Sequence, residues 1–436
     1  MTDDAEGTCG ETPVLSVKDL TVSFVQAYKE VTAVSGVSFD LYPGETLALV
    51  GESGSGKTVT ALSCLQLLPP LARILSGQIT VKGKPVFGAD EAALRNIRGN
   101  RVGIIFQEPM TSLNPLHSIE KQVGEALYVH RGLDKDAVRA RVIELLLLVG
   151  LPQPEKRLTA LPHELSGGQR QRVMIAMALA LNPDVLIADE PTTALDVTIQ
   201  AQILELLQDL QRRLGMAILF ITHDLAIVRR IADRVCVMQG GKLVEHGNVK
   251  DIFSSPGHPY TRSLLAAQPR AVDKKQPDTN EELIATEDLK VWFPIKKGVI
   301  RRTVDHIKAV DGVSFALKRG QTMGIVGESG SGKTTLGLAL LRLISSTGSI
   351  YFSGQRIDGL TRQDLRPLRR SMQIVFQDPY GSLSPRLSIG QICEEGLIVH
   401  ALGEGPADRQ GRVREALAAV DLDPDSLDRY PHEFSG

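Results

Sequence analysis

The sequence predicts two consecutive α/β domains, each built around a mostly parallel sheet. Two observations lead to this fold class. The nonapeptide Val-Gly-Glu-Ser-Gly-Ser-Gly-Lys-Thr occurs twice, at residues 50–58 and 326–334, and each copy lies between an apolar stretch and a helix-like one. Around the first copy, short apolar strands alternate with amphipathic helices, which is typical of strands that pair in parallel through crossover helices. The length of 436 residues allows two or three domains.

The elements of the first repeat follow in order along the chain. A short buried strand is expected before the loop, and an apolar helix after it that Pro69-Pro70 ends. A helix, a strand, an amphipathic helix and a further buried strand come later. The expected ranges are 46–50, 58–68, 138–149, 185–188, 199–214 and 217–221.

Residues of the two halves match at a nearly constant offset, which sets the domain boundaries. Phe24 pairs with Phe293 and Gln107 with Gln377, while a drift before the second loop indicates extra surface-loop residues within 296–306. The polar stretch 272–282 reads as a linker. We therefore expect an N-terminal tail at 1–14, a first domain at 15–271 and a second domain at 283–436.

Composition excludes several classes of protein. The net charge of -2 gives no basic excess, so nucleic acid is not an expected partner. The four cysteines are scattered, without the close pairs of a metal site, and are read as reduced thiols. The acidic start does not resemble a secretory signal. No apolar run approaches the roughly 20 residues that span a bilayer, so no membrane span of its own is expected.

The repeated nonapeptide predicts a phosphate-binding loop. Its glycines let backbone N–H groups turn toward phosphate oxygens, Lys57 brings a positive charge, and the Thr58 hydroxyl suits magnesium. A glycine-rich turn with a solvated lysine is the simpler alternative, but the flanking strand and helix and the repetition favour phosphate. The predicted residues are Gly51, Glu52, Ser53, Gly54, Ser55, Gly56, Lys57, Thr58 and Val59, and Gly327, Glu328, Ser329, Gly330, Ser331, Gly332, Lys333, Thr334 and Thr335.

Acidic and polar residues at the ends of later strands predict hydrolysis of the bound phosphate. Asp189 can hold the water shell of the metal, and Glu190 can orient or deprotonate the attacking water. His223, after the next strand, could reach the same terminal phosphate, although a lone histidine is usually structural. Ahead of these, Ser166 can cap a helix whose first residues, Gly167, Gly168 and Gln169, expose N–H groups as a second anion site.

In this order, the loop, Gln107, the stretch from Leu165 to Gln169, Asp189-Glu190, Ala194-Leu195-Asp196 and His223 resemble an ATP-binding cassette (ABC) ATPase. The stretches 106–115, 376–385 and 255–261 are similar to the dipeptide and oligopeptide importer subfamily, in which some members fuse two cassettes. This resemblance implies P-loop NTPase domains, each with a RecA-like sheet, an antiparallel β subdomain and a helical subdomain. It implies ATP and Mg²⁺ as ligands and uptake of peptides, with microcin C-like, di- or oligopeptide and glutathione cargo as the classes.

The resemblance also implies partners and further residue roles. Two permease subunits and an extracytoplasmic binding protein would work with the chain, peripheral on the cytoplasmic face of the inner membrane. Gln107 and Gln377 would sense the terminal phosphate and, with Thr58, Asp189 and Thr334, assist the metal. Phe24 and Phe293 would stack on adenine, or are ordinary strand aromatics. Ala194, Leu195 and Asp196 would form the loop that lies at the interface when two cassettes pair.

Cassettes of this family pair head to tail, so that the signature of one faces the phosphate loop of the other. The second signature begins only at Ser435-Gly436, where the sequence ends. We therefore expect neither composite site to be complete in one chain, and the second domain to be truncated, with exposed apolar surface and low stability alone. The sequence leaves open a fragment of a longer subunit or a symmetric dimer through the first domains. Two other functions remain as alternatives: a soluble tandem cassette outside transport, and a nucleotide-binding protein without turnover.

Overall fold

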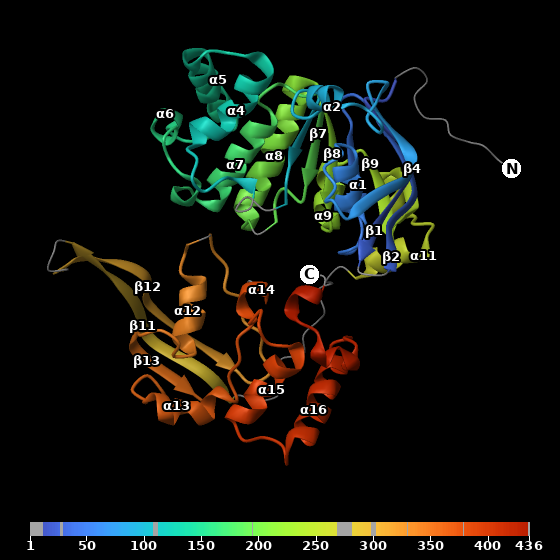
Figure 1. Ribbon diagram of the computed structural model, residues 1–436. Helices are drawn as coiled ribbons and strands as arrows, with labels where there is room; N and C mark the ends of the chain where they lie inside the picture. The colour runs from blue at the N-terminus through green and yellow to red at the C-terminus, as the bar shows by residue number, and fades with distance from the viewer. Residues whose placement is uncertain are drawn as a thin grey trace. The chain divides into compact units, whose positions relative to one another are not determined.

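The computed structural model describes residues 12–26, 29–107, 112–193, 195–267, 281–297, 302–328, 330–377 and 379–434. The chain divides into two compact units, Met1–Arg270 and Ala271–Gly436 (Figure 1).

A six-stranded sheet forms the centre of the first unit. The order is β10-β9-β3-β8-β7-β6, in which the five strands from β9 to β6 are parallel and β10 is antiparallel to β9. Strand β3 is buried throughout, as expected for a parallel strand with helices on both faces. The predicted α/β class with a mostly parallel sheet is confirmed. The bounds are β3 Thr46–Val50, β6 Val102–Ile105, β7 Val185–Asp189, β8 Ala217–Thr222, β9 Arg234–Gln239 and β10 Lys242–Asn248.

An antiparallel sheet lies at one end of this unit and helices lie at the other (Figure 1). The sheet has the order β2-β1-β4-β5. One apolar cluster, which includes Val17, Leu20, Leu47 and Leu49, joins it to the central sheet. Its strands are β1 Leu15–Gln26, β2 Lys29–Leu41, β4 Ala72–Val81 and β5 Lys84–Pro85, and the two helices near it are α1 Lys57–Ser63 and α2 Glu91–Ile97.

Helix α1 is shorter than the sequence predicts, because it ends at Ser63 and not near Leu68. The turn that follows takes Gln66 into the left-handed region, at φ 49°. The Arg98 side chain donates to the carbonyl oxygens of Leu65 and Gln66, at 2.8 and 2.9 Å. A long-range side chain therefore supplies the hydrogen bonds that another helical turn would have made.

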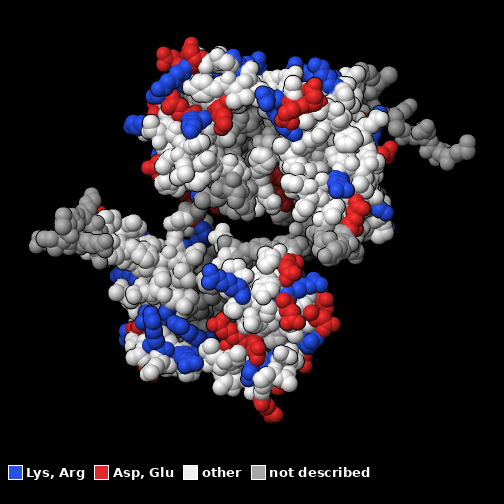
Figure 2. Space-filling model, viewed as in Figure 1, with Lys and Arg blue, Asp and Glu red and all other residues white. Residues whose placement is uncertain are grey.

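The helical part of the first unit consists of α4 Ile119–Arg131, α5 Lys135–Leu148, α6 Pro154–Arg157, the 3₁₀ turn η1 Pro162–Glu164 and α7 Gly167–Ala178. Helix α8, Val197–Leu214, shares one apolar cluster with α4, α5 and α7. On the face seen in Figure 2, positive and negative side chains alternate over this part. Arg139 pairs with Glu120 at 3.2 Å and Arg141 with Glu144 at 2.7 Å.

Three helices complete the first unit: α9 Leu225–Ile231, α10 Val249–Ser254 and α11 Pro259–Ala266. They bury a third apolar cluster against Ala48 and Val50 of β3. The strand that leads into the first phosphate loop is thus covered on both faces. None of the helices in the described part of the chain is both long and apolar enough to span a bilayer.

The second unit repeats the antiparallel sheet and the helical part. Its sheet has the order β12-β11-β13-β14. The strands are β11 Glu282–Lys297, β12 Arg302–Lys318, β13 Thr347–Phe352 and β14 Gln355–Arg356. The helices are α12 Lys333–Leu340, α13 Arg362–Arg369, α14 Pro379–Ser382, α15 Ile389–Val399 and α16 Pro406–Ala419, with 3₁₀ turns η2 Pro424–Asp428 and η3 Pro431–Glu433.

The expected phosphate-loop strand of the second unit does not form. Residues 322–326 and 372–375 match β3 and β6, but they make no strand in the described residues. A strand needs a partner, and residues 281–434 have no described counterpart of β7, β8 or β9. Val326 is 91% exposed and Val375 97% exposed. The prediction of exposed apolar surface in this unit is therefore confirmed.

Candidate nucleotide site

The first phosphate loop runs from the end of β3 into α1 and is packed so tightly that only glycine fits at two positions. A Cβ at Gly51 would lie 2.2 Å from the carbonyl oxygen of Met238, and one at Gly56 would lie 2.6 Å from that of Ala33. Gly56 also has φ 99°, which side-chain residues rarely adopt. Backbone from two other strands therefore supports the loop from outside.

Lys57 lies inside this loop. Its ammonium donates to the carbonyl oxygens of Gly51 and Glu52, both at 2.8 Å, and the residue is 6% exposed. Burial lowers the pKa of Lys57, and the carboxylates of Glu190 and Asp189 oppose that shift. The loop thus holds a buried positive charge where the phosphates of a nucleotide are expected.

Asp189 ends β7 next to the loop. Burial raises its pKa to about 6, against a hydrogen bond from Thr58 and the charge of Lys57. The carboxylate is 3% exposed, and within the described structure its Oδ1 atom is buried without a hydrogen-bond partner. A buried carboxylate oxygen with no donor, beside a threonine hydroxyl, fits the hard oxygen ligands that Mg²⁺ prefers.

Glu190 is held by three side chains, two of them from distant segments and one from its own turn. His223 Nδ1 lies 3.0 Å from Oε1, while Oε2 accepts from Gln107 Nε2 at 3.1 Å and from Thr193 Oγ1 at 2.9 Å. The backbone of Glu190 has φ 45°, an unusual left-handed conformation for a residue with a side chain. Strained backbone of this kind persists where the surroundings enforce it, often at functional sites.

These contacts keep Glu190 ionised. Burial alone would raise its pKa, but the hydrogen bonds from His223 and Thr193 and the charges of His223 and Lys57 outweigh burial and lower it. The predicted residues Gln107, Glu190 and His223 therefore meet at one point, although their chain positions are far apart. Thr193 was missed by sequence reasoning. Its place three residues after Glu190, in a polar turn, was the available signal.

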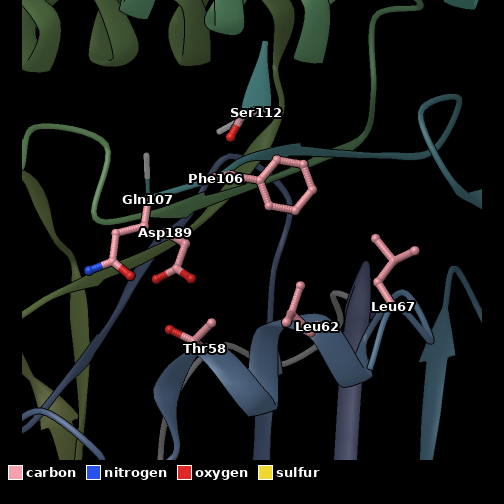
Figure 3. A pocket seen from close by; sticks show the side chains of 7 residues that line it. All are labelled: Thr58, Leu62, Leu67, Phe106, Gln107, Ser112 and Asp189. Atoms are coloured by element: carbon pink, nitrogen blue, oxygen red, sulfur yellow. The ribbon is translucent and has the colours of Figure 1, made fainter. Parts of the chain in front are cut away.

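A cavity of about 630 Å³ opens beside this group (Figure 3). Thr58, Gln107 and Asp189 bring oxygen atoms to one side, and Leu62, Leu67 and Phe106 form an apolar side. The predicted metal-binding oxygens thus face one space, which also has an apolar wall.

The segment Leu165 to Gln169 begins α7 as predicted. The Ser166 hydroxyl accepts from the Gln169 N–H at 3.4 Å, and the Gln169 side chain accepts from the Ser166 N–H at 3.2 Å. A Cβ at Gly168 would lie 2.8 Å from the side chain of Ile199 in α8. Gly167 lies near Leu195, where an added Cβ would come within 3.6 Å of the leucine side chain. The segment is therefore a capped helix start packed on α8.

Asp196 has a structural task in this arrangement. It caps α8 by accepting from the Ile199 N–H at 3.0 Å. Ala194 lies outside the described residues.

The second loop repeats the geometry of the first. Lys333 donates to the carbonyl oxygens of Gly327 and Glu328, at 2.7 and 2.6 Å. Thr334 begins α12 together with Lys333, and Gln377 is exposed in the segment that forms no strand. Ser329, Ser435 and Gly436 lie outside the described residues.

The two aromatic residues that were expected near adenine differ in burial. Phe24 lies opposite Val31 in the β1–β2 pair and packs against an apolar cluster. Phe293 lies opposite Ile307 and is 43% exposed. Of the two residues, Phe24 is therefore more like an ordinary aromatic residue of a strand than Phe293 is.

Comparison with known proteins agrees with this geometry. The ABC transporter family matches residues 34–193 and 310–436, and the C-terminal region of oligopeptide/dipeptide transporters matches residues 244–290. A peptidoglycan transport ATP-binding protein, YejF of Agrobacterium fabrum (strain C58), is 60% identical over 97% of this chain and 78% of its own length.

Further relatives have similar coverage. YejF of Escherichia coli (strain K12), an uncharacterised ABC transporter ATP-binding protein, is 53% identical over 97% of this chain and 80% of its own length. The glutathione import ATP-binding protein GsiA of Salmonella paratyphi A is 45% identical over 97% and 73%. Among solved structures, the dimeric bacterial ABC transporter cassette MJ0796 is 28% identical, covers 54% of this chain and 98% of its own, and has a TM-score of 0.49.

The family match covers both loops, and the first unit has the expected central sheet, antiparallel sheet and helical part. The chain therefore belongs to the ABC transporter family, as an ATP-binding protein with the ATPase cassette fold.

Proposed function

We propose that this chain is the ATP-hydrolysing subunit of a peptide importer, and that its first unit is the site of hydrolysis. The observation that carries the proposal is the position of Glu190, ionised and held by three donors, next to the buried charge of Lys57. Such a carboxylate can accept a proton from water that attacks a terminal phosphate.

The reaction transfers the terminal phosphoryl group of ATP to water and gives ADP and phosphate. Lys57 would stabilise negative charge on the phosphate oxygens, and backbone N–H groups of the glycine-rich loop would bind them. Thr58, Asp189 and Gln107 would hold Mg²⁺, which when bound neutralises charge on the terminal phosphates. Glu190 receives or orients the water proton, and His223 keeps the carboxylate directed.

Glu190 can accept from water in its present position, because a carboxylate has about four lone pairs and the three contacts described here occupy three of them. Its Oε2 accepts from both Gln107 and Thr193, whereas Oε1 has His223. Gln107 lies on an exposed segment after β6 and can move without unfolding a strand. Movement of Gln107 toward the terminal phosphate would leave Oε2 with Thr193 alone and give the carboxylate a second free acceptor position for water.

A second cassette is needed to complete such a site in this family. The capped start of α7, with Ser166, Gly167 and Gly168, would face the phosphate loop of that cassette. Leu195 and Asp196, just before α8, would lie between the pair. Phe24 would stack on the adenine of the first site. In the second domain, Phe293, Gln377 and Thr334 would take the corresponding roles.

The peptide class rests on the match of residues 244–290 to oligopeptide and dipeptide transporters and on the names of the relatives, which transport peptidoglycan or import glutathione. Two permease subunits and an extracytoplasmic binding protein would complete the importer, with this chain on the cytoplasmic membrane face. We propose residues 15–271 and 283–436 as the two cassette domains, with 1–14 as a tail and 272–282 as a linker.

ATP turnover by the full chain tests the hydrolysis. Glu190→Gln keeps the size and polarity of the side chain but removes the base, so turnover should fall about 10²- to 10⁴-fold while ATP still binds. Glu205→Gln, on the exposed side of α8, is the matched control and should keep wild-type turnover. Unchanged turnover in Glu190→Gln would refute the proposed site. If the wild-type chain binds ATP but does not hydrolyse it, a regulatory nucleotide-binding protein would be favoured.

Uptake tests the peptide class. Cells that lack the gene should lose uptake of a labelled peptide, and the wild-type gene should restore it while the Glu190→Gln gene should not. Uptake that persists without the gene would refute the class without affecting the hydrolysis result.

A further inference from the structure

The segment after the last strand of the first unit contacts the phosphate loop. It begins with a fixed turn between α10 and α11, in which the Glu245 carboxylate accepts from the backbone N–H groups of Gly257 and His258, at 2.6 and 3.1 Å. The His258 side chain then caps α11 by accepting from the Tyr260 N–H at 3.2 Å. The first turn of α11, which carries Tyr260, is therefore held in place from β10.

Tyr260 reaches from this helix to the loop. Its ring belongs to the apolar cluster that includes Ala48 and Val50 of β3, and the residue is 9% exposed. Its hydroxyl oxygen accepts from the backbone N–H of Glu52 at 3.1 Å. Glu52 is the second residue of the loop, so the contact lies where the chain leaves the strand.

This hydrogen bond fixes a particular peptide group. The carbonyl oxygen of Gly51 and the N–H of Glu52 belong to the same peptide plane. Lys57 binds the carbonyl side at 2.8 Å and Tyr260 binds the N–H side at 3.1 Å. The bond from Glu52 to Tyr260 uses the opposite side of this peptide, so Lys57 could turn toward phosphate oxygens without breaking it.

We propose that Tyr260 is a positioning residue of the first nucleotide site, whose hydroxyl holds the Gly51–Glu52 peptide and so prepares the loop for the phosphates of ATP. The inference rests on the proposed function, because it assumes that this loop binds ATP. A loop that is already ordered loses less conformational entropy on binding, so the hydroxyl contributes to affinity without touching the nucleotide.

The second loop lacks this support. Its lysine makes the same two carbonyl bonds, but in the described residues no tyrosine hydroxyl contacts the N–H of Glu328. Within the described residues, the second copy of the nonapeptide therefore makes its two lysine bonds without a tyrosine hydroxyl at this N–H.

Tyr260→Phe tests the proposal, because it removes the hydroxyl and keeps the buried ring. Every protein in this test should be the full chain with Lys333→Ala, so that the measured nucleotide binding comes from the first loop alone. Titration with MgATP and with MgADP should give a Kd about 3- to 10-fold higher for both nucleotides, the loss expected for one hydrogen bond. Turnover at saturating ATP should stay within about twofold, since the bond acts on binding.

Two controls separate this result from a general loss of structure. Tyr128→Phe makes the same chemical change at an exposed tyrosine of α4 and should leave the Kd unchanged. Lys57→Ala should abolish binding. If Tyr260→Phe and wild type have equal Kd values and Lys57→Ala does not bind, the role of Tyr260 is overturned. The proposed function then remains intact. Binding that survives Lys57→Ala would overturn both.

Hydrogen exchange supplies a measurement that does not depend on the variant folding normally. The Glu52 amide of the wild-type chain should exchange slowly without nucleotide, and in Tyr260→Phe it should exchange faster while the amides of β3 stay protected. A rapidly exchanging Glu52 amide in the wild type would overturn the proposal.

Discussion

The two phosphate loops have the same sequence and nearly the same backbone, yet they lie in different surroundings. Their lysines make the same pair of carbonyl bonds, at 2.8 and 2.8 Å in the first loop and 2.7 and 2.6 Å in the second. Three pairs of glycines have closely similar φ angles: 152° and 158° at Gly51 and Gly327, 77° and 80° at Gly54 and Gly330, and 99° and 93° at Gly56 and Gly332.

The surroundings differ in what precedes and faces each loop. Strand β3 is hydrogen-bonded to β8 on one side and β9 on the other, whereas residues 321–328 form no described strand. The first loop faces Asp189 and Glu190, and the described second unit has no counterpart of β7 to carry such carboxylates. The shape of a phosphate loop is thus a local property of its sequence, while its chemistry depends on distant strands.

The largest expected difference between the two loops is in hydrogen exchange. Amides of residues 46–50 should exchange at least about 10³-fold more slowly than those of 322–326, because only the first set is in a paired, buried strand. Mass spectrometry of the full chain measures both sets in one sample. Helices α1 and α12 follow the loops and serve as the matched reference. Equal protection of the two segments would contradict the comparison.

The next largest effect is expected from the two lysines. Lys57→Ala should lower ATP turnover by at least about 10²- to 10³-fold, because it removes both ATP binding at the first loop and a charge that stabilises the transition state. Lys333→Ala should leave turnover within about threefold of wild type, because its loop faces no described carboxylates. Steady-state phosphate release measures both. Equal losses in the two variants would mean that the second loop also takes part in hydrolysis.

Replacing the first glycine of each loop by alanine should destabilise the first unit more than the second. In Gly51→Ala the new Cβ meets the Met238 carbonyl oxygen at 2.2 Å, whereas in Gly327→Ala the nearest atom is the movable Ser331 hydroxyl at 2.8 Å. Both alanines would also take a positive φ that side-chain residues rarely adopt. We expect Gly51→Ala to lower the free energy of unfolding of its unit by about 2–4 kcal/mol, and Gly327→Ala to lower that of its own unit by about 1–2 kcal/mol, mostly through this backbone strain.

Urea unfolding checks this pair of variants. The only tryptophan, Trp292, reports on the second unit by fluorescence, and hydrogen exchange reports on the first. A larger loss in the Gly327→Ala protein would show that backbone contacts around Gly51 are not what distinguishes the loops.

The smallest expected effect is a pH dependence confined to the first loop. Because burial holds the pKa of Asp189 near 6, the gain in ATP affinity that Mg²⁺ provides should fall about tenfold between pH 7.5 and pH 5 as this carboxylate takes up a proton. The stability of the metal-free fold changes with pH in the opposite direction. The folded state binds more protons than the unfolded chain between pH 4 and 6, so lowering the pH through that window stabilises it.

Titrations with and without Mg²⁺ at the two pH values measure this effect. Asp189→Asn removes the titrating group and should flatten the pH profile. If the affinity gain from Mg²⁺ falls by the same factor in Asp189→Asn, the titrating group is another residue.

The sequence predicted the parts of the molecule that depend on local pattern. The buried runs of β3, β7 and β8 and the cap of α7 by Ser166 follow from a few neighbouring residues. The early end of α1 could not be predicted, because Arg98 lies more than 30 residues away from the carbonyls it binds. The pattern named Gln107, Glu190 and His223 but not Thr193, whose hydroxyl contacts the carboxylate only in the particular turn that follows Glu190.

The left-handed backbone of Glu190 has a consequence for engineering and for natural variation. Such a conformation costs on the order of 1–3 kcal/mol for a residue with a side chain and nothing comparable for glycine. Glu190→Gly would relieve that strain while removing the carboxylate that activates water. That relief would be offset by the loss of the hydrogen bonds from His223, Gln107 and Thr193, so the contacts that enforce the strained backbone are the same ones that hold the base in place. A search for stabilised variants should therefore hold residue 190 constant.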